Sequence, residues 1–69
     1  MTDLPIAAVD RLIRRSDSTM RVSDDASIAL IEILEEHGLK IAKQAAEFSK
    51  HANRKTITDA DIKLAAKNV

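Results

Sequence analysis

The chain has 69 residues, so it forms one domain at most, and its single Gly and single Pro favour helices over turn-rich β-structure. The absence of Cys excludes a disulfide framework and the common structural zinc sites. The formal charge is zero, which by itself argues against a nucleic-acid binder, but the charges are segregated: residues 23–38 hold five acids and no Lys or Arg, whereas residues 39–55 hold five bases and one acid. One surface can therefore be cationic on a neutral protein.

A chain of this size buries only about 60% of the surface that its unfolded form exposes, so a lone copy is marginally stable. With no disulfide or metal to help, association with a second copy is the remaining source of stability. No apolar run approaches the roughly 20 residues that span a bilayer, and the first residues lack the charged-then-apolar pattern expected of a signal peptide. We expect a soluble, cytoplasmic protein with no membrane partner.

The first predicted element is a basic amphipathic helix from about Leu4 to Arg15. Pro5 suits the first helical turn, where its missing N–H is not needed. Apolar residues at helical spacing form an inner stripe, while the arginines point elsewhere. Taken alone, such arginines fit a solvated helix face. The stripe is Ile6, Val9 and Ile13, and the basic residues are Arg11, Arg14 and Arg15.

Residues 16–19 form a polar loop, and residues 20–22 form a short extended run. Ser23 then caps a long helix that can be followed to Ala52, with acids in its first turn where the helix dipole favours them. Its apolar residues occupy about two-thirds of the circumference, so this helix must be covered from several sides. The main apolar line is Leu30, Ile33, Leu34, His37, Ile41, Ala45, Phe48 and Ala52, and a second line is Ile28, Ile31, Leu39, Ala42 and Ala46.

Gly38 lies at the centre of this helix. One interpretation is a helix C-cap that splits the segment in two. The apolar line keeps its phase across the glycine, however, and no turn residues follow it. A glycine inside a helix costs about 1 kcal/mol relative to Ala, which suggests a close backbone approach. We therefore predict that two copies of the long helix cross at Gly38.

Asn53 ends the long helix as a residue that tolerates the left-handed conformation. Residues 54–57 mirror the extended run of the first loop. Thr58 then caps the last helix, with Asp61 at capping-box spacing. Its inner face is Ile62, Ala65, Ala66 and Val69.

This order of elements, with these residues, resembles the archaeal histone family across nearly the whole chain. Each matching segment is weak alone, and together they are specific. The segments are Leu4-Pro5-Ile6-Ala7, Arg21-Val22-Ser23-Asp24-Asp25-Ala26, Ile33-Leu34-Glu35-Glu36, His51-Ala52-Asn53-Arg54-Lys55-Thr56-Ile57 and Ala60-Asp61-Ile62.

The resemblance implies an all-α histone fold over residues 1–69, in an intertwined dimer whose long helices cross. The first loop of one chain would pair with the second loop of the other as short parallel strands. Double-stranded DNA would lie along the first helices and the paired loops, held by its sugar-phosphate backbone. The positions matching the family's DNA contacts are Arg11, Arg14, Arg21, Lys55 and Thr56.

The resemblance also implies that Arg54 and Asp61 form a pair locking the second loop to the last helix. Phe48, His51 and Asp61 match the positions where family dimers meet in a four-helix contact. His37 is best interpreted as a core or interface residue. The chain departs from the family pattern in the first loop, which has one additional residue and no glycine, and at Asn53, where glycine is usual. These departures bear on how closely successive dimers can stack on DNA.

Together, the residues and the resemblance predict an architectural protein: a homodimer that binds, bends and wraps DNA without reading its sequence, and associates further into tetramers or longer polymers on the chromosome. A heterodimer with a related histone is the alternative pairing. The rival function is a histone-fold dimerisation module in a transcription or chromatin complex, which the neutral charge favours. No set of nucleophile, base and orienting residue can be assembled, so we expect neither an enzyme nor a cofactor.

Overall fold

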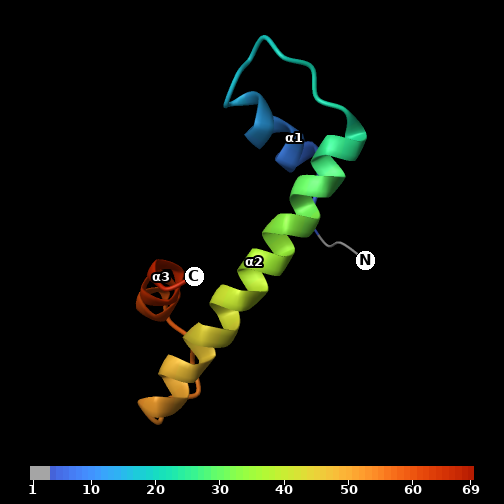
Figure 1. The fold of residues 1–69 in the computed structure, drawn as a ribbon. Coiled ribbons are helices and arrows are strands. Elements are labelled where there is room, and N and C mark those ends of the chain that lie inside the picture. The colour runs from blue at the N-terminus through green and yellow to red at the C-terminus, as the bar shows by residue number, and fades with distance from the viewer. Residues whose placement is uncertain (1–3) are drawn as a thin grey trace. The chain divides into compact units, whose positions relative to one another are not determined.

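The computed structural model describes residues 4–69 and contains three helices, α1 (Ile6–Arg14), α2 (Asp24–His51) and α3 (Asp59–Lys67), with no strand in that part of the chain. The predicted all-α class and the order of short, long and short helix are confirmed (Figure 1). The chain divides into two compact units, one ending at Glu35 and the other beginning at Glu36. None of the described helices is long and apolar enough to cross a lipid bilayer.

Helix α1 begins two residues later than predicted. Pro5 lies outside the first turn, at the N-cap, where its ψ of 126° is extended and its carbonyl accepts the first helical hydrogen bond, from Val9 N at 3.2 Å. An N-cap residue needs non-helical dihedrals, and the fixed φ of proline is compatible with an extended ψ. None of the described side chains caps this end of the helix.

Helix α2 is one uninterrupted helix of 28 residues. At its start the Ser23 hydroxyl accepts a hydrogen bond from Ala26 N at 3.0 Å, as the predicted cap requires, and Asp24 and Asp25 occupy the first turn. Gly38 has no positive φ, so the interpretation of His37-Gly38 as a helix end is wrong.

The C-terminus of α2 is a Schellman motif. Asn53 has a φ of 57°, which confirms its predicted left-handed conformation. Its N–H donates to Lys50 O at 3.0 Å, and Arg54 N–H donates to Ser49 O at 2.9 Å. These two bonds satisfy carbonyls that a helix end leaves without intrahelical partners. They also turn the chain back toward α2 immediately after the helix ends at His51, one residue before the predicted end.

The start of α3 confirms the predicted capping arrangement. Thr58 is the N-cap, with its hydroxyl accepting from Asp61 N, while the Asp61 carboxylate accepts from Thr58 N. This reciprocal capping box satisfies two N–H groups at once. It also carries Asp61 into a buried position at the start of the helix.

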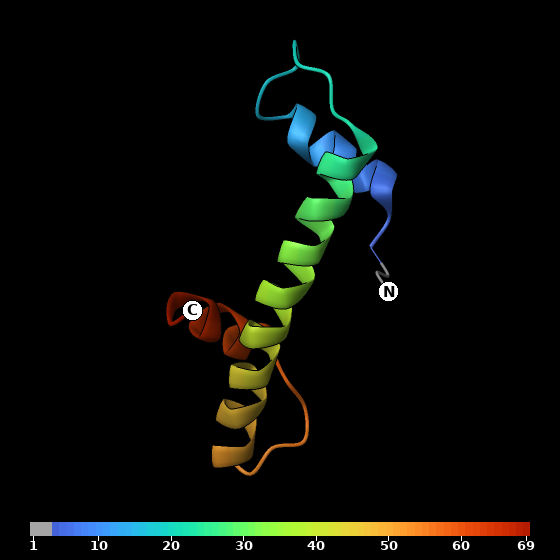
Figure 2. The same cartoon turned by 45° about the vertical axis from the view of Figure 1, so that its right-hand side comes forward.

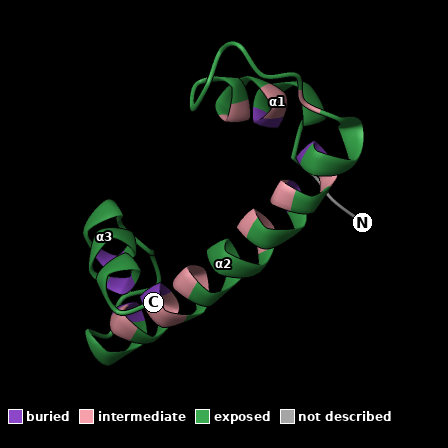
Figure 3. Cartoon of the chain, turned by 45° about the horizontal axis from the view of Figure 1, so that its top comes forward, coloured by how far each residue is buried: buried purple, intermediate pink, exposed green. Residues whose placement is uncertain are grey.

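Fewer residues of α2 are buried than its apolar pattern predicts. Helix α1 lies beside the first half of α2 and α3 lies beside the second half (Figure 2), and the buried positions lie at these two places (Figure 3). Most residues of the main apolar line of α2 are exposed or only half-buried, and Ile33 keeps 62% of its surface accessible. Each unit therefore covers only part of its own half of α2 and leaves apolar residues of that half open. The buried residues among those described are Val9, Ser27, Ile31, Ala45, Ser49, Asp61 and Ala65.

Candidate nucleic-acid interface

Two of the predicted DNA contacts lie in the last turn of α1. Arg11 and Arg14 are both exposed. Arg14 Nε donates to Asp10 Oδ1 at 3.1 Å, one turn earlier, and its side chain remains 56% accessible. Arg11 forms no ion pair with any residue in the described range. This helix end therefore offers positive charge that is at most weakly neutralised, because an exposed pair of this spacing contributes only about 0.3–0.5 kcal/mol.

The first loop carries Arg21, which is exposed and, within residues 4–69, has no ion-pair partner. Asp17 shapes the loop before it: its Oδ1 accepts from the Thr19 hydroxyl at 2.6 Å and from Thr19 N–H at 2.9 Å. The hydroxyl bond, aided by the backbone bond, lowers the pKa of Asp17 below its ordinary value. All of these bonds are local and exposed.

The second loop carries Lys55 and Thr56, both exposed. The Lys55 ammonium and the Thr56 hydroxyl make no hydrogen bond to the chain within the described residues. Both groups are therefore available to an external acceptor. A phosphate oxygen suits both, since one supplies a charged donor and the other a hydroxyl.

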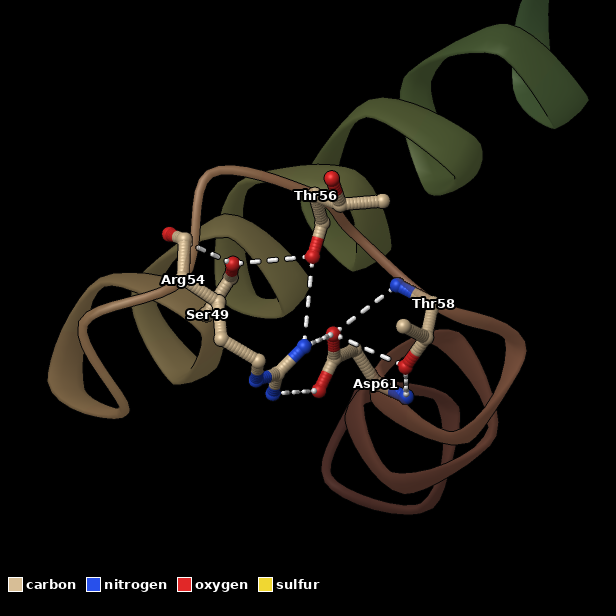
Figure 4. A network of polar contacts seen from close by, with 5 residues as sticks. All are labelled: Ser49, Arg54, Thr56, Thr58 and Asp61. Atoms are coloured by element: carbon tan, nitrogen blue, oxygen red, sulfur yellow. Dashed lines mark hydrogen bonds and ion pairs between the residues drawn. The ribbon is translucent and has the colours of Figure 1, made fainter.

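Behind this loop, the structure brings Arg54 and Asp61 together in a two-pronged ion pair (Figure 4). Arg54 Nη1 donates to Asp61 Oδ2 and Arg54 Nη2 donates to Asp61 Oδ1, each at 2.9 Å. Thr58 adds its N–H at 2.9 Å and its hydroxyl at 3.1 Å to Oδ2. The guanidinium first, and then the Thr58 N–H, hold the pKa of Asp61 far below its ordinary value. The same pair raises the pKa of Arg54.

Ser49, in the last turn of α2, is a part of this network that the sequence did not reveal. Its buried hydroxyl lies 3.0 Å from both Arg54 O and Thr56 O. A serine two residues from a helix end is usually an ordinary surface residue. The only available signal was its place four residues before the left-handed Asn53, which the Schellman geometry brings next to the returning loop.

The residues predicted for contacts between dimers all belong to the second unit. Phe48 is half-buried, His51 is exposed, and both line a shallow hollow on α2 that also holds Lys40 and Lys43. Asp61 is different, because both of its carboxylate oxygens already accept hydrogen bonds within the chain. Any contact that Asp61 makes with another dimer must share those oxygens.

Gly38 is exposed, and a Cβ placed on it meets no heavy atom of the described residues within 4 Å, apart from its chain neighbours and the adjoining backbone of α2. Packing within one chain therefore gives no reason for a glycine at this position. The described residues contain no group of three or more Asp, Glu or His side chains that could hold a metal ion.

The three helices and the two loops built on α2 define a histone fold. Residues 2–66 match the model of a family described as histone-like transcription factor (CBF/NF-Y) and archaeal histone, and the chain belongs to this family. It is 51% identical over 67 residues to a subunit of the archaeal histone HAN1 of Thermococcus zilligii, an alignment that covers 97% of this chain and 98% of the relative. It is 38% identical over 65 residues to probable archaeal histone 3 of Methanocaldococcus jannaschii, covering 94% and 96%. This membership confirms that the chain is a histone-family protein and not an enzyme.

Proposed function

We propose that two copies of this chain form one intertwined histone-fold dimer that binds double-stranded DNA through its backbone and bends or wraps it. The observation that carries the proposal is the set of exposed cations on both units, on α1 and on each loop, in a member of a histone family. The predicted contacts are Arg11, Arg14, Arg21, Lys55 and Thr56. Each unit supplies part of this set, and pairing of the chains would combine them into one surface.

Pairing is supported by the apolar surface that a single chain leaves open. Among the described residues the buried hydrophobic ones are Val9, Ile31, Ala45 and Ala65, two of which are only alanine. Leu39 is 56% accessible on α2. In the first unit, α1 and Leu34 line an apolar groove. Covering such groups removes apolar area from water at about 25 cal/mol per Å². We therefore regard residues 1–69 as one domain that is completed by its partner.

Gly38 supports a close crossing of two long helices. The residue is exposed, and an added Cβ would have open space around it, so packing within one chain does not require a glycine here. If no partner approaches, Gly38→Ala stabilises the protein by about 1 kcal/mol through helix propensity. If a second α2 crosses at this point, Gly38→Leu destabilises the dimer by about 1–3 kcal/mol through overpacking. Sedimentation without DNA, combined with urea unfolding of both variants, separates these outcomes.

DNA is the favoured ligand because of where the cations lie. Arginine suits a narrowed minor groove, and lysine and threonine suit phosphate oxygens. A dimerisation module in a transcription or chromatin complex is the second candidate, supported by the neutral charge and by the transcription factors in the family description. A dimerisation module does not require cations at these particular places, on α1 and on both loops.

Further assembly is part of the proposal. Phe48, His51 and Asp61 would form a four-helix contact between dimers, giving tetramers or longer polymers on the chromosome in the cytoplasm. Homodimers are the simplest pairing. A heterodimer with a related histone is the alternative, and the Thermococcus zilligii relative is itself named as one subunit of HAN1.

The test is a salt titration of DNA binding on two unrelated duplexes, with bending followed by energy transfer between the duplex ends. Four cationic positions on each of two chains limit the slope of log affinity against log salt to roughly −7. Lys55→Ala should weaken binding to both duplexes alike and make the slope shallower by about 2. Arg11→Ala or Arg21→Ala should in addition reduce bending. Salt-insensitive binding, or strong preference for one duplex, would exclude this function.

A further inference from the structure

We propose that Ser49 is a positioning residue for DNA binding, whose buried hydroxyl fixes the second loop so that Lys55 is presented in a set place. This inference rests on the proposed function, because it gives Ser49 a role only if the second loop contacts DNA. Ser49 has 3% of its surface accessible and cannot itself reach a ligand.

The hydroxyl acts on the residues on both sides of Lys55. Ser49 Oγ donates to Arg54 O and to Thr56 O, each at 3.0 Å (Figure 4). A hydroxyl has one hydrogen, so the two carbonyls share it. Lys55 stands between these two anchored carbonyls, and its backbone path is therefore held from either side.

The backbone of Ser49 also bonds to the second loop. Its carbonyl accepts from Arg54 N–H at 2.9 Å, so both the amide and the carbonyl of Arg54 bond to one residue. In a Schellman motif, a hydrophobic contact commonly joins the two positions that Ser49 and Arg54 occupy. Here a hydrogen bond replaces that contact. A hydrogen bond has a direction, so it fixes where the Arg54 carbonyl points, which a hydrophobic contact would not.

The ion pair does not make the hydroxyl redundant. Arg54 Nη1 also donates to Thr56 O, at 3.2 Å, so this carbonyl keeps one donor without Ser49. The Arg54 carbonyl has only the Ser49 hydroxyl as a donor within the described residues. Loss of the hydroxyl therefore leaves the Arg54 carbonyl, just before Lys55, without a donor. The bond from Arg54 N–H to Ser49 O and the bonds of the Arg54 guanidinium to Thr56 O and Asp61 remain.

The test uses Ser49→Ala, Ser49→Cys and the matched control Ser27→Ala. Cys is close to Ser in size but is a poor donor. Ser27 is the other buried serine of α2, 1% accessible, and belongs to the first unit, whereas the second loop belongs to the second unit. We expect Ser49→Ala and Ser49→Cys to fold and to speed amide hydrogen exchange without DNA at Arg54, whose N–H bonds to Ser49 O. We also expect both variants to weaken DNA binding about threefold to tenfold, since the loop must then be ordered on binding.

Double-mutant cycles distinguish positioning from a general loss of stability. Lys55→Ala should have a smaller effect in the Ser49→Ala background than in the wild type, whereas Arg14→Ala should have the same effect in both. Equal behaviour of Ser49→Ala and Ser27→Ala, or additivity with Lys55→Ala, would overturn the inference. If the wild type itself binds no DNA, the proposed function fails, and the exchange measurement without DNA still shows whether Ser49 holds the loop.

Discussion

The two loops of this chain hold their predicted DNA contacts in different ways. Around the first loop, the hydrogen bonds span at most four residues and join exposed groups, such as Ser16 to Ile13 O and Thr19 to Asp17. Around the second loop, Ser49 and Arg54 also form bonds that span five to seven residues. These bonds tie the loop to both α2 and α3 and involve a buried serine and a buried carboxylate.

This difference indicates which loop is formed by a single chain. The second loop has partners on two helices of its own unit, so we expect it to keep its shape without a second chain. Within the described residues, the bonds of the first loop join it only to itself and to the adjoining end of α1, and we expect pairing to fix its shape. In the proposed dimer, the first loop of each chain pairs with the second loop of its partner. The preformed second loop would then bind a more adaptable first loop.

The comparison of the two loops predicts the largest loss of stability for a substitution of Asp61. This side chain accepts four hydrogen bonds and its backbone donates a fifth. Asp61→Asn places an amide against the Arg54 guanidinium and leaves that charge without its partner. We expect the melting temperature to fall by roughly 10 °C or more. Asp17→Asn, the matched change in the first loop, keeps an oxygen for Thr19 and should lower it far less. If Asp61→Asn and Asp17→Asn lowered the melting temperature equally at the same protein concentration, the two loops would not differ in how firmly a single chain holds them.

The pH dependence of stability sharpens the same distinction. In the folded chain the pKa of Asp61 lies far below its ordinary value of about 3.9. Below about pH 4 the unfolded state therefore binds more protons than the folded state, and stability falls as the pH decreases. The stabilisation is complete above about pH 5. We expect the difference in melting temperature between wild type and Asp61→Asn to shrink from pH 6 to pH 3. A constant difference would show that the carboxylate charge is not what holds the loop.

The features that could be predicted from the sequence are those fixed by neighbouring residues. The Ser23 cap, the capping box of Thr58 and Asp61, and the left-handed Asn53 each depend on a few adjacent positions. The helix order follows from the spacing of apolar residues. The ion pair of Arg54 with Asp61 came from the family resemblance, since seven residues of separation carry no local signal.

Other features could not be predicted because periodicity shows which faces of a helix are apolar but not what covers them. On α2 the buried residues include Ala45 from the predicted main line, Ile31 from the second line and Ser49 from neither, while Ile33 on the main line is exposed. The role of the Ser49 hydroxyl depends on a chain reversal that brings back residues five and seven positions later. No pattern within the helix encodes that reversal.

A smaller effect is expected from Asp10 on DNA binding. Its carboxylate holds Arg14 Nε at 3.1 Å, so DNA must compete with it for this arginine. Asp10→Ala should raise DNA affinity about twofold to threefold at low salt, and lower stability by no more than about 0.5 kcal/mol. Glu36→Ala is the matched control, because it removes the same charge and breaks an i,i+4 pair with Lys40, which is not a predicted DNA contact. The same gain in affinity for both variants would mean that Arg14 is not engaged by DNA.

The smallest expected effect is the loss of one hydroxyl from the first loop. The Thr19 hydroxyl donates to Asp17 Oδ1 at 2.6 Å, but both groups are exposed, and water replaces the bond when it is lost. Thr19→Ala also keeps the backbone bond from Thr19 N–H to the same oxygen. We expect a change in the free energy of unfolding within about 0.5 kcal/mol. Ser49→Ala also removes one hydroxyl, but it leaves a carbonyl of the second loop without its donor next to the buried serine position, and should cost about 1–3 kcal/mol. Urea unfolding of both variants at equal protein concentration compares them directly. If Thr19→Ala proved as destabilising as Ser49→Ala, the first loop would be held as firmly within one chain as the second, and pairing would not be needed to fix it.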